Sequence, residues 1–505
     1  MLTFFLALFI VGNTMKIILA GYNVDSEVLE DLKKCSPPRE DVTPETLSAS
    51  YARISRDPRP VNELRAVSRK EVERARRSNR NIIFKMGHHS VAEHAVFNFD
   101  IIGVSRLAIE EIEKFRLCSY TEKSQRYVTL TDDFIIPEEI QKAGMKDLFV
   151  KTVKAQNALY HTLLEELKPY FFEKNRNMAA DSKKHSILEG WAKEDARYVT
   201  CLAIEGQLGM TVNARNLEHM IRRFASKKLA ELKEFNQKVY GLAKEVAPSI
   251  ILFTEASDFD AKTYGEIEEK ARQLLGPERK ITKPVSLVDH TPEADNKLVA
   301  SLLHTSSSWP YEECLKKARH LQPGAKRELV EQTFKYMEFY DFPLREFEYP
   351  SLTYDLVVSA SCFAQLKRHR VATLTVQNYN PGLGVTVPPS IEEIGAKKGF
   401  MGIIEETNRV YSLLEEKMEY GIEYVLTNAH RRRVLIKINA RELYHISRLR
   451  EDATAQWDIR GMSAEMSRLA QEKMPLTCLL LGGKDVYPSL YKAVFGQPPK
   501  FSPPE

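Results

Sequence analysis

The sequence contains one pattern twice, first as Asn213-Ala214-Arg215-Asn216-Leu217-Glu218-His219 and again as Asn439-Ala440-Arg441-Glu442-Leu443-Tyr444-His445. A second landmark precedes each of these stretches. It reads Lys114-Phe115-Arg116, seven residues, Ser124 in the first case, and Arg368-His369-Arg370, seven residues, Asn378 in the second. Because two landmarks recur in the same order, we expect two tandem copies of one fold.

Each copy predicts the same local structure around its landmarks. A strand is expected at 96–101, where Phe97, Phe99 and Ile101 alternate with polar residues, and at 351–356 in the second copy. A helix follows each strand and ends at the tripeptide. Each Asn-Ala-Arg pattern is expected to open one long amphipathic helix, which stops before Pro248 in copy one and before Pro475 in copy two.

Composition places the chain among globular proteins of two to three domains. It has 505 residues, of which 43% are hydrophobic and 28% charged. The net charge of +4 is too small to indicate a nucleic-acid partner. Six cysteines occur without a C-x-x-C pair, which is typical of reduced thiols in a cytoplasmic protein.

The first residues form a short apolar stretch. Residues 2–11 reach half the length that a membrane-spanning helix needs, no basic residue precedes them, and no small-residue cleavage site follows. Met15 comes next, and residues 16–21 after it are expected to form the first strand. A start site assigned too far upstream is favoured over a signal peptide or an accessory tail, so we expect a soluble protein with no membrane partner.

Polar clusters near the landmarks are candidates for binding an anion. Two arginines flanking His369 can hold a phosphate or carboxylate by paired hydrogen bonds, although a solvated helix end is the alternative. Glu122, Ser124 and Arg126 alternate as on one side of an extended segment, with Arg197 as a further cation. The alternative is an exposed polar strand.

Other classes of site are disfavoured. His88, Glu93 and His94 are possible zinc ligands, but no fourth ligand follows at a recognisable spacing, so no metal is expected. The sequence lacks the G-x-S-x-G motif of many serine hydrolases near Ser124. It also lacks G-x-G-x-x-G after its first strand, so a Rossmann cofactor site is not supported.

In their order, these motifs resemble the signature of the flavin-dependent thymidylate synthases. That signature combines R-H-R-x7-S with an upstream G-H-x-S-x-x-E-H, here at 87–94, and a downstream N-A-R-x-L-x-H/N-x-x-x-L-R. The resemblance implies an α+β fold in which each tandem copy has an antiparallel or mixed sheet flanked by long helices. It places copy one at 15–250, a helical linker at 251–284, copy two at 285–485 and a C-terminal tail at 486–505, with 1–14 outside the fold.

The resemblance also implies an activity. The family converts dUMP to dTMP with FAD as cofactor, taking the carbon from methylenetetrahydrofolate and the hydride from NADPH. Its active sites lie between the subunits of a homotetramer, so that different subunits hold the flavin and the nucleotide.

Matched residue by residue, copy one retains the positions that hold the dUMP phosphate, namely Glu122, Ser124, Arg126 and Arg197. It also retains the FAD-binding positions Ser55, His88 and Ser90. It lacks the basic tripeptide, because Phe115 stands where the family has histidine. Phe224 stands where a late arginine is expected.

Copy two retains the opposite set. The resemblance assigns dUMP binding to Gln365, Arg368 and Arg450, and FAD binding to Arg368, His369, Arg370, Asn439, Arg441 and His445. Arg450 is the expected catalytic residue, which favours the ionised uracil ring. The copy-two counterparts of Glu122, Ser124 and Arg126 are Val376, Asn378 and Asn380. Glu423 stands where copy one has Arg197.

These complementary losses suggest that the two copies stand in for two subunits. A homodimer would then mimic the tetramer, with composite sites that join the phosphate pocket of copy one to the flavin and uracil side of copy two. The alternatives are a non-catalytic flavin- or nucleotide-binding protein of the same fold, and an enzyme that acts on another pyrimidine nucleotide.

Overall fold

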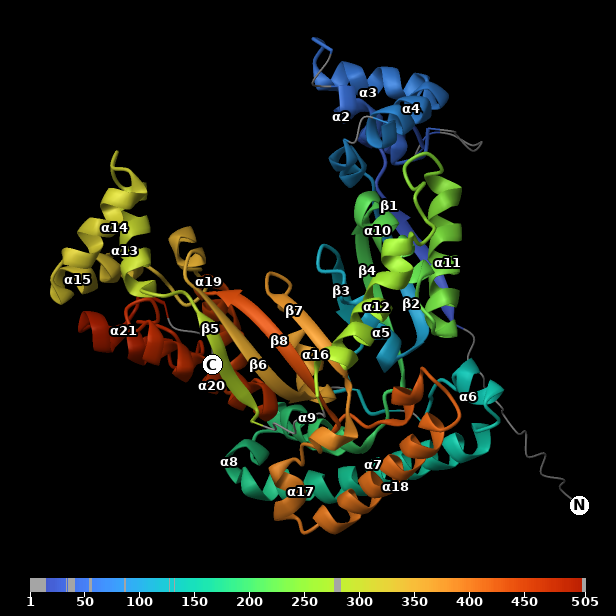
Figure 1. Ribbon diagram of the computed structural model, residues 1–505, viewed down its shortest axis with the longest axis vertical. Helices are drawn as coiled ribbons and strands as arrows, with labels where there is room; N and C mark the ends of the chain where they lie inside the picture. The colour runs from blue at the N-terminus through green and yellow to red at the C-terminus, as the bar shows by residue number, and fades with distance from the viewer. Residues whose placement is uncertain are drawn as a thin grey trace, which may run out of the picture. The chain divides into compact units, whose positions relative to one another are not determined.

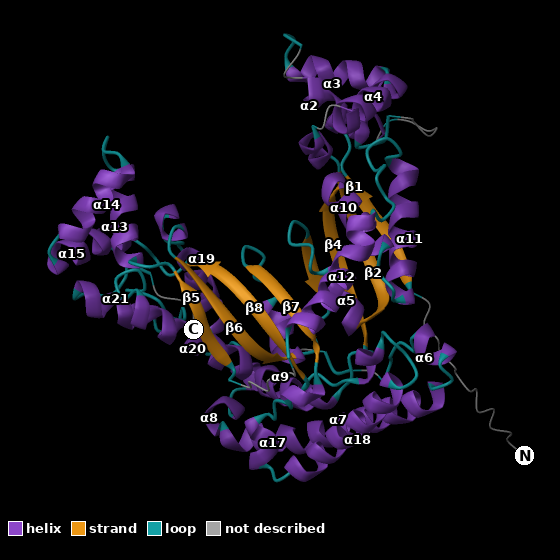
Figure 2. Cartoon of the chain, in the orientation of Figure 1, coloured by secondary structure: helices purple, strands orange, loops and turns teal. Residues whose placement is uncertain are grey.

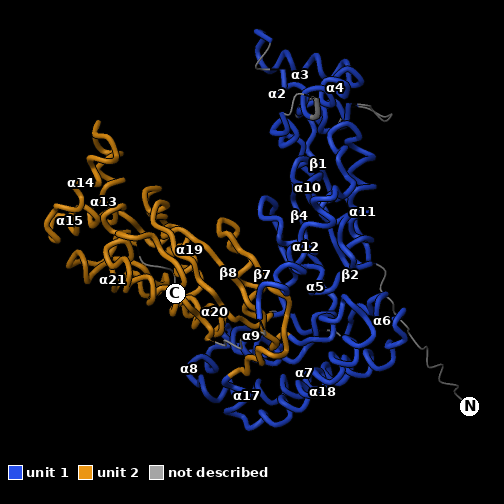
Figure 3. The backbone as a smooth tube through the Cα atoms, in the orientation of Figure 1, with its two compact units in different colours: residues 1–278, 389–427 blue, residues 279–388, 428–505 orange. Residues whose placement is uncertain are grey.

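The computed structural model describes residues 15–32, 34, 41–53, 57–85, 88–126, 128–130, 132–276 and 283–501. The chain forms two compact units, shown in Figures 1 and 3. Unit 1 comprises residues 1–278 and 389–427, and unit 2 comprises residues 279–388 and 428–505.

Each unit contains one antiparallel sheet of four strands within the described residues (Figure 2). In unit 1 the order is β1 (Lys16–Tyr22), β2 (Val96–Ser105), β4 (Glu205–Asn213) and β3 (Ser119–Glu122). In unit 2 it is β5 (Val285–His290), β6 (Ser351–Ser359), β8 (Arg431–Asn439) and β7 (Thr373–Tyr379). The shared order confirms the α+β fold and fits the two-copy arrangement.

The register of the two sheets fixes which positions correspond. Glu122 pairs with Leu208 in unit 1 as Val376 pairs with Val434 in unit 2. In the same way Val104 pairs with Gly206, and Val358 pairs with Arg432. Gly206 and Arg432 therefore occupy equivalent places in the two sheets.

The strands predicted from alternating side chains are confirmed. Phe97, Phe99 and Ile101 on β2 are buried, and so are Leu352 and Tyr354 on β6. Each strand leads into a short helix, α5 (Arg106–Ile112) or α16 (Ala360–Leu366). The serine before each helix accepts a backbone N–H hydrogen bond from the first turn, as an N-cap does.

Side chains on β4 and β8 alternate between buried and more exposed positions, so packed helices cover one face of each sheet. The remaining helices of unit 1 include α1 (Ser26–Leu32), α2 (Glu45–Arg53), α3 (Val61–Lys70), α4 (Val72–Asn79), α6 (Glu138–Lys142), α7 (Lys146–Lys174), α8 (Arg176–Ala179), α9 (His185–Ala196), α10 (Ala214–Ala225), α11 (Ala230–Val246), α12 (Asp258–Leu274), α17 (Pro389–Glu393) and α18 (Lys397–Glu415). Those of unit 2 include α13 (Ala294–Thr305), α14 (Tyr311–His320), α15 (Pro323–Phe334), α19 (Ala440–Arg450), α20 (Trp457–Lys473) and α21 (Tyr487–Phe495). Within the described residues, no helix is long and apolar enough to cross a membrane.

The prediction of one long helix after each Asn-Ala-Arg pattern is wrong. Two helices follow instead, α10 and α11 in copy one and α19 and α20 in copy two. A separate second helix begins in each copy, because a side chain accepts a hydrogen bond from a backbone N–H group in its first turn. The Glu139 carboxylate accepts from the Ala230 N–H at 2.7 Å, and the Gln456 side chain accepts from the Ile459 N–H at 3.3 Å.

Segment 389–427 of copy two belongs to unit 1, where α17 and α18 pack beside α7. The Gln156 amide of α7 donates to Thr407 Oγ1 at 2.9 Å and to the Val425 carbonyl at 3.0 Å. Cys201 and Thr427 form an antiparallel bridge, and they stand the same number of residues before Asn213 and Asn439. A surface of copy one thus meets its own counterpart from copy two, which is the pairing of a two-fold dimer.

A buried carboxylate anchors this segment of copy two. Glu231 accepts hydrogen bonds from the Ser105 N–H at 2.6 Å, the Ser105 hydroxyl at 2.7 Å and the Tyr424 hydroxyl at 2.6 Å. Tyr424 lies in the short helical turn η7 (Ile422–Val425). Burial raises the pKa of Glu231, so its ionised form depends on these donors.

Replacing Tyr424 with phenylalanine should destabilise unit 1. The change leaves the Glu231 carboxylate buried with one donor fewer, which costs about 1–3 kcal/mol. The free energy of unfolding in urea measures the effect. Tyr336→Phe is the control, because this ring is 81% exposed. Equal stability of the two variants would contradict the anchoring role.

Candidate functional site

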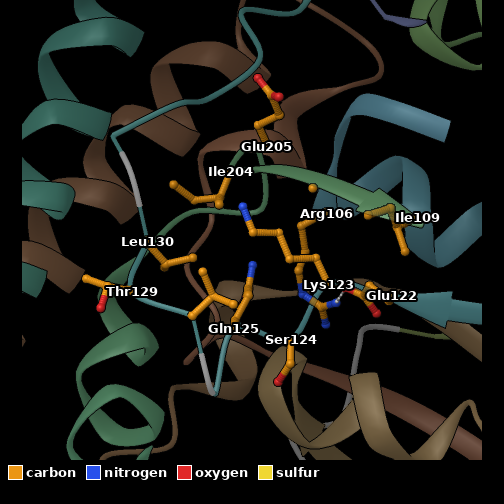
Figure 4. Close-up of a pocket in the computed structure, with 12 residues that line it drawn as sticks. Arg106, Ile109, Glu122, Lys123, Ser124, Gln125, Thr129, Leu130, Ile204 and Glu205 are labelled. Atoms are coloured by element: carbon orange, nitrogen blue, oxygen red, sulfur yellow. Dashed lines mark hydrogen bonds and ion pairs between the residues drawn. The ribbon is translucent and has the colours of Figure 1, made fainter. Parts of the chain in front are cut away.

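A small pocket lies in unit 1 where β3 ends (Figure 4). Glu122, Ser124 and Gly206 line it, together with Arg106, Lys123 and Gln125. Two of the residues predicted to hold a phosphate, Glu122 and Ser124, therefore share one pocket.

Arg106 connects this pocket to the protein interior. Its guanidinium lies 3.3 Å from the Glu122 carboxylate and 3.3 Å from the Glu110 carboxylate, and its side chain is 3% exposed. Figure 4 shows the contact with Glu122. A buried cation between two carboxylates holds Glu122 at the end of β3.

The other two predicted phosphate residues join the same cluster. Ser124 Oγ accepts from the Arg126 N–H at 3.2 Å, and the Arg126 guanidinium forms an ion pair with Glu194 of α9. Arg197, in the short turn η4 (Arg197–Val199), is buried. Burial lowers the pKa of Arg197, Glu194 opposes this effect, and the positive fields of Arg106 and Arg126 add to it. The Arg106 and Arg126 guanidinium groups each lie beside a carboxylate, so much of the positive charge of this cluster is balanced within the protein.

Gly206 lines the pocket and packs closely against Ile109. A Cβ at this position would lie 2.7 Å from Ile109 Cδ1. Ile109 stands four residues after the N-cap serine of its helix, and its counterpart in copy two is Phe363. The absence of a side chain at 206 thus leaves room for Ile109.

The same place in unit 2 is filled. Arg432 replaces glycine, and its guanidinium carbon lies 4.8 Å from the Phe363 ring centre and 4.3 Å from that of Tyr379. Arg432 Nε donates to the Gln377 carbonyl at 2.9 Å, and the residue is 5% exposed. A cation held between two rings is stable without an external anion.

Unit 2 instead builds a polar cluster around His369. Arg450 Nε donates to His369 Nε2 at 3.0 Å, and Arg450 Nη2 donates to the Gln365 carbonyl at 3.3 Å. The Gln365 amide donates to Gln456 Oε1 at 3.3 Å. On its other side His369 Nδ1 lies 3.5 Å from Glu442 Oε1. The structure therefore brings together three predicted residues, Gln365, His369 and Arg450.

These contacts fix the protonation state of His369. Arginine donates only, so Nε2 of the ring must be an acceptor, and the ring proton lies on Nδ1 facing Glu442. Burial, reinforced by Arg450, lowers the pKa of His369 to about 3. His369 is neutral at physiological pH.

The remaining predicted residues of copy two lie around α19. Asn439 caps the helix, accepting the Glu442 N–H at 2.8 Å. The Arg441 guanidinium donates to Glu348 Oε1 at 3.0 Å, and the His445 ring lies 5.6 Å from that of His369. Arg368 and Arg370 are exposed on either side of buried His369.

Copy one replaces the polar pair with an aromatic one. Phe115 and Phe224 stand at the positions of His369 and Arg450, and their ring centres lie 5.3 Å apart in an edge-to-face contact. Phe115 keeps the contact with His219, at 5.8 Å, that His369 makes with His445. The copy-one counterpart of the Arg450 cluster has thus become apolar core.

The upstream histidine motif lies elsewhere in unit 1. His88 and Ser90 are exposed at the start of the turn η2 (His89–His94), and Ser55 lies outside the described residues. His89 lines a second pocket that also includes Arg215 and His219. Within the described ranges, no group of three or more potential metal ligands comes together.

Sequence reasoning missed four residues that shape these sites, namely Arg106, Gly206, Arg432 and Glu442. Position-by-position comparison of the two copies carries a signal for Gly206 and Arg432, since glycine opposite arginine marks a difference in free space. Arg106 pairs with Glu110 one turn later on its own helix, a spacing that the sequence shows, whereas its second partner, Glu122, comes from β3. The partner of Glu442 comes from another element, so its spacing alone gives no signal.

Comparison with known proteins identifies the family. The family model of the thymidylate synthase complementing proteins matches residues 40–249 and again 286–476, so the chain belongs to this family. The flavin-dependent thymidylate synthase of Clostridium tetani is 29% identical over 218 residues, covering 42% of this chain and 83% of that protein. The UPF0159 protein of Chlamydia muridarum is 22% identical over 416 residues, covering 77% of each.

Among solved structures, Thymidylate Synthase X (ThyX) from Helicobacter pylori, with FAD and dUMP, is 15% identical with a TM-score of 0.29. The match covers 47% of this chain and 99% of that one.

The neutral His369 predicts a pH dependence of stability. Its pKa is about 3 in the folded protein against an ordinary 6.5, so only the unfolded chain gains this proton between those values. Stability from this group is complete above pH 6.5 and falls as the pH drops, by about 2 kcal/mol at pH 5. His369→Gln keeps an acceptor and a donor but does not titrate. Unfolding free energies from pH 7.5 to 5 should therefore fall less steeply in the variant, and parallel curves would contradict the assignment.

Proposed function

We propose that this protein is a flavin-dependent thymidylate synthase, which methylates dUMP to dTMP with FAD, methylenetetrahydrofolate and NADPH. The observation that supports this most strongly is complementarity. Copy one has a pocket lined by Ser124 and Arg106 where copy two has the buried Arg432, and copy two has the Arg450 cluster where copy one has two phenylalanines. Independent decay of both copies would not spare opposite halves of one site.

In this proposal copy one holds the nucleotide phosphate. Ser124 offers a hydroxyl at the pocket, and Arg126 and Arg197 supply positive charge. Charged hydrogen bonds of this kind are the usual means of holding a phosphate. Glu122 would act by keeping Arg106 in place beside the pocket, through the contact at 3.3 Å.

Copy two would contribute the flavin and uracil side. The exposed guanidinium groups of Arg368 and Arg370 fit the charge of a flavin pyrophosphate. Arg441 adds a third cation, and the expected flavin contacts also include Asn439 and His445, with Ser55, His88 and Ser90 from copy one. When bound, FAD supplies the redox and carbon-transfer chemistry.

Arg450 is the proposed catalytic residue. Its guanidinium would stabilise negative charge that develops on the uracil ring, and this makes C5 a better nucleophile. No protein nucleophile is needed, because the ring itself attacks. The two halves would meet in a homodimer that mimics the family's tetramer, with two working sites of four.

The first test replaces Gly206, which lines the pocket. Gly206→Arg introduces the side chain that fills this place in copy two, so it should abolish dUMP binding while leaving flavin binding intact. Visible absorbance of the bound flavin during a dUMP titration measures both. Arg432→Gly is the matched control and should leave dUMP binding unchanged. Flavin that does not respond to dUMP in the wild-type protein would favour another substrate, and absence of flavin would favour a binding protein.

The second test asks whether both copies serve one site. Arg126→Ala and Arg450→Ala lie in different copies, yet each should lower dTMP formation at least about tenfold, because each removes a charged hydrogen-bond donor. If sites form between chains, co-expressing the two variants should restore about a quarter of the activity, since half of the dimers then carry one intact site. Full activity in either single variant would contradict the composite site.

A further inference from the structure

Glu442 lies at a helix position where glutamate commonly caps the helix N-terminus, but its side chain does not do so here. It is the third residue after the N-cap Asn439, where a glutamate side chain often bonds back to the N-cap backbone. In this helix its backbone N–H binds Asn439, but its carboxylate faces His369 Nδ1 at 3.5 Å. The side chain is 7% exposed, so it is directed into the protein.

This carboxylate begins a chain of contacts that ends on Arg450. Glu442 faces Nδ1 of His369, and Nε2 of the same ring accepts from Arg450 Nε at 3.0 Å. A second bond, from Arg450 Nη2 to the Gln365 carbonyl at 3.3 Å, fixes the plane of the guanidinium. Two bonds to different nitrogens leave the group little rotational freedom, which lowers the entropy lost when it binds a ligand.

Copy one has different side chains at the three equivalent positions. There the three positions hold Phe115, Phe224 and Asn216 instead of His369, Arg450 and Glu442. The two rings pack edge to face, and the Asn216 amide donates to Asn213 Oδ1 at 2.8 Å. The glutamate is present where the histidine and arginine are present and absent where they are absent.

We propose that Glu442 and His369 are positioning residues that orient Arg450 for the uracil ring. At 3.5 Å the Glu442 carboxylate does not hydrogen-bond Nδ1, and its charge favours the tautomer with the ring proton on that side, whose Nε2 can accept from Arg450. His369 itself is 4% exposed, and both of its ring nitrogens face protein groups, so it acts through Arg450 rather than as a proton donor. The effect on uracil rests on the proposed function, whereas the coupling of the three side chains does not.

The coupling is tested without any ligand. His369→Phe, Arg450→Phe and the double variant are compared by urea unfolding of the full chain. His369→Phe alone leaves the Arg450 guanidinium without its acceptor, so it should destabilise, whereas the double variant recreates the pair that folds in copy one. We expect the double variant to lose less stability than the sum of the single losses. Additive losses would overturn the coupling.

The role of Glu442 is tested by Glu442→Asn and Glu442→Gln in the flavin-loaded protein. Glu442→Asn installs the residue of copy one, whose shorter side chain cannot reach the ring, and should lower kcat about tenfold with little change in FAD affinity. Glu442→Gln keeps an oxygen acceptor and should recover most of that loss. A merely structural role would instead lower stability and FAD affinity together. Asn216→Glu in copy one is the control and should change neither kcat nor dUMP affinity.

The experiments distinguish failure of the proposed function from failure of the positioning role. A wild-type protein that binds neither flavin nor dUMP would refute the proposed function, and the unfolding comparison would still decide whether the three side chains are coupled. An active wild-type enzyme whose kcat is unchanged in Glu442→Asn would refute the positioning role alone.

Discussion

The hydrogen bond from Tyr424 to Glu231 holds the two copies together within unit 1. A carboxylate taken out of water costs several kcal/mol unless donors surround it, and here one of its three donors comes from the other copy. The helix pair α7 and α18 and the bridge between Cys201 and Thr427 depend on the same segment being in place. The repeat therefore does not divide into two separate domains at its midpoint.

Where the two copies differ, each has a well-packed structure of its own. Arg432 lies between two rings, and Phe115 packs against Phe224, so neither place is an empty remnant. Stable replacements of this kind leave the fold intact. They also explain why two sheets with the same strand order carry different side-chain clusters.

Much of this could be predicted from the sequence, and the rest fails for physical reasons. Alternating residues such as Phe97 and Phe99 identify strands, because a repeat of two residues places every second side chain on the buried face of a sheet. The break between α10 and α11 was missed because the carboxylate that caps the second helix, Glu139, is distant in sequence. Local patterns show the spacing of Arg106 and Glu110 on one helix, but they give no sign of Glu122 on β3, the second carboxylate beside the Arg106 guanidinium.

Fusion of the copies has a genetic consequence. In a symmetric dimer every substitution occurs on both sides of the two-fold axis, so neither side can change alone. In this chain Ser390 donates to Asp195 at 2.5 Å on one side, whereas the residues at the matching positions are Glu139 and Gly421. One gene thus encodes two surfaces that mutate independently.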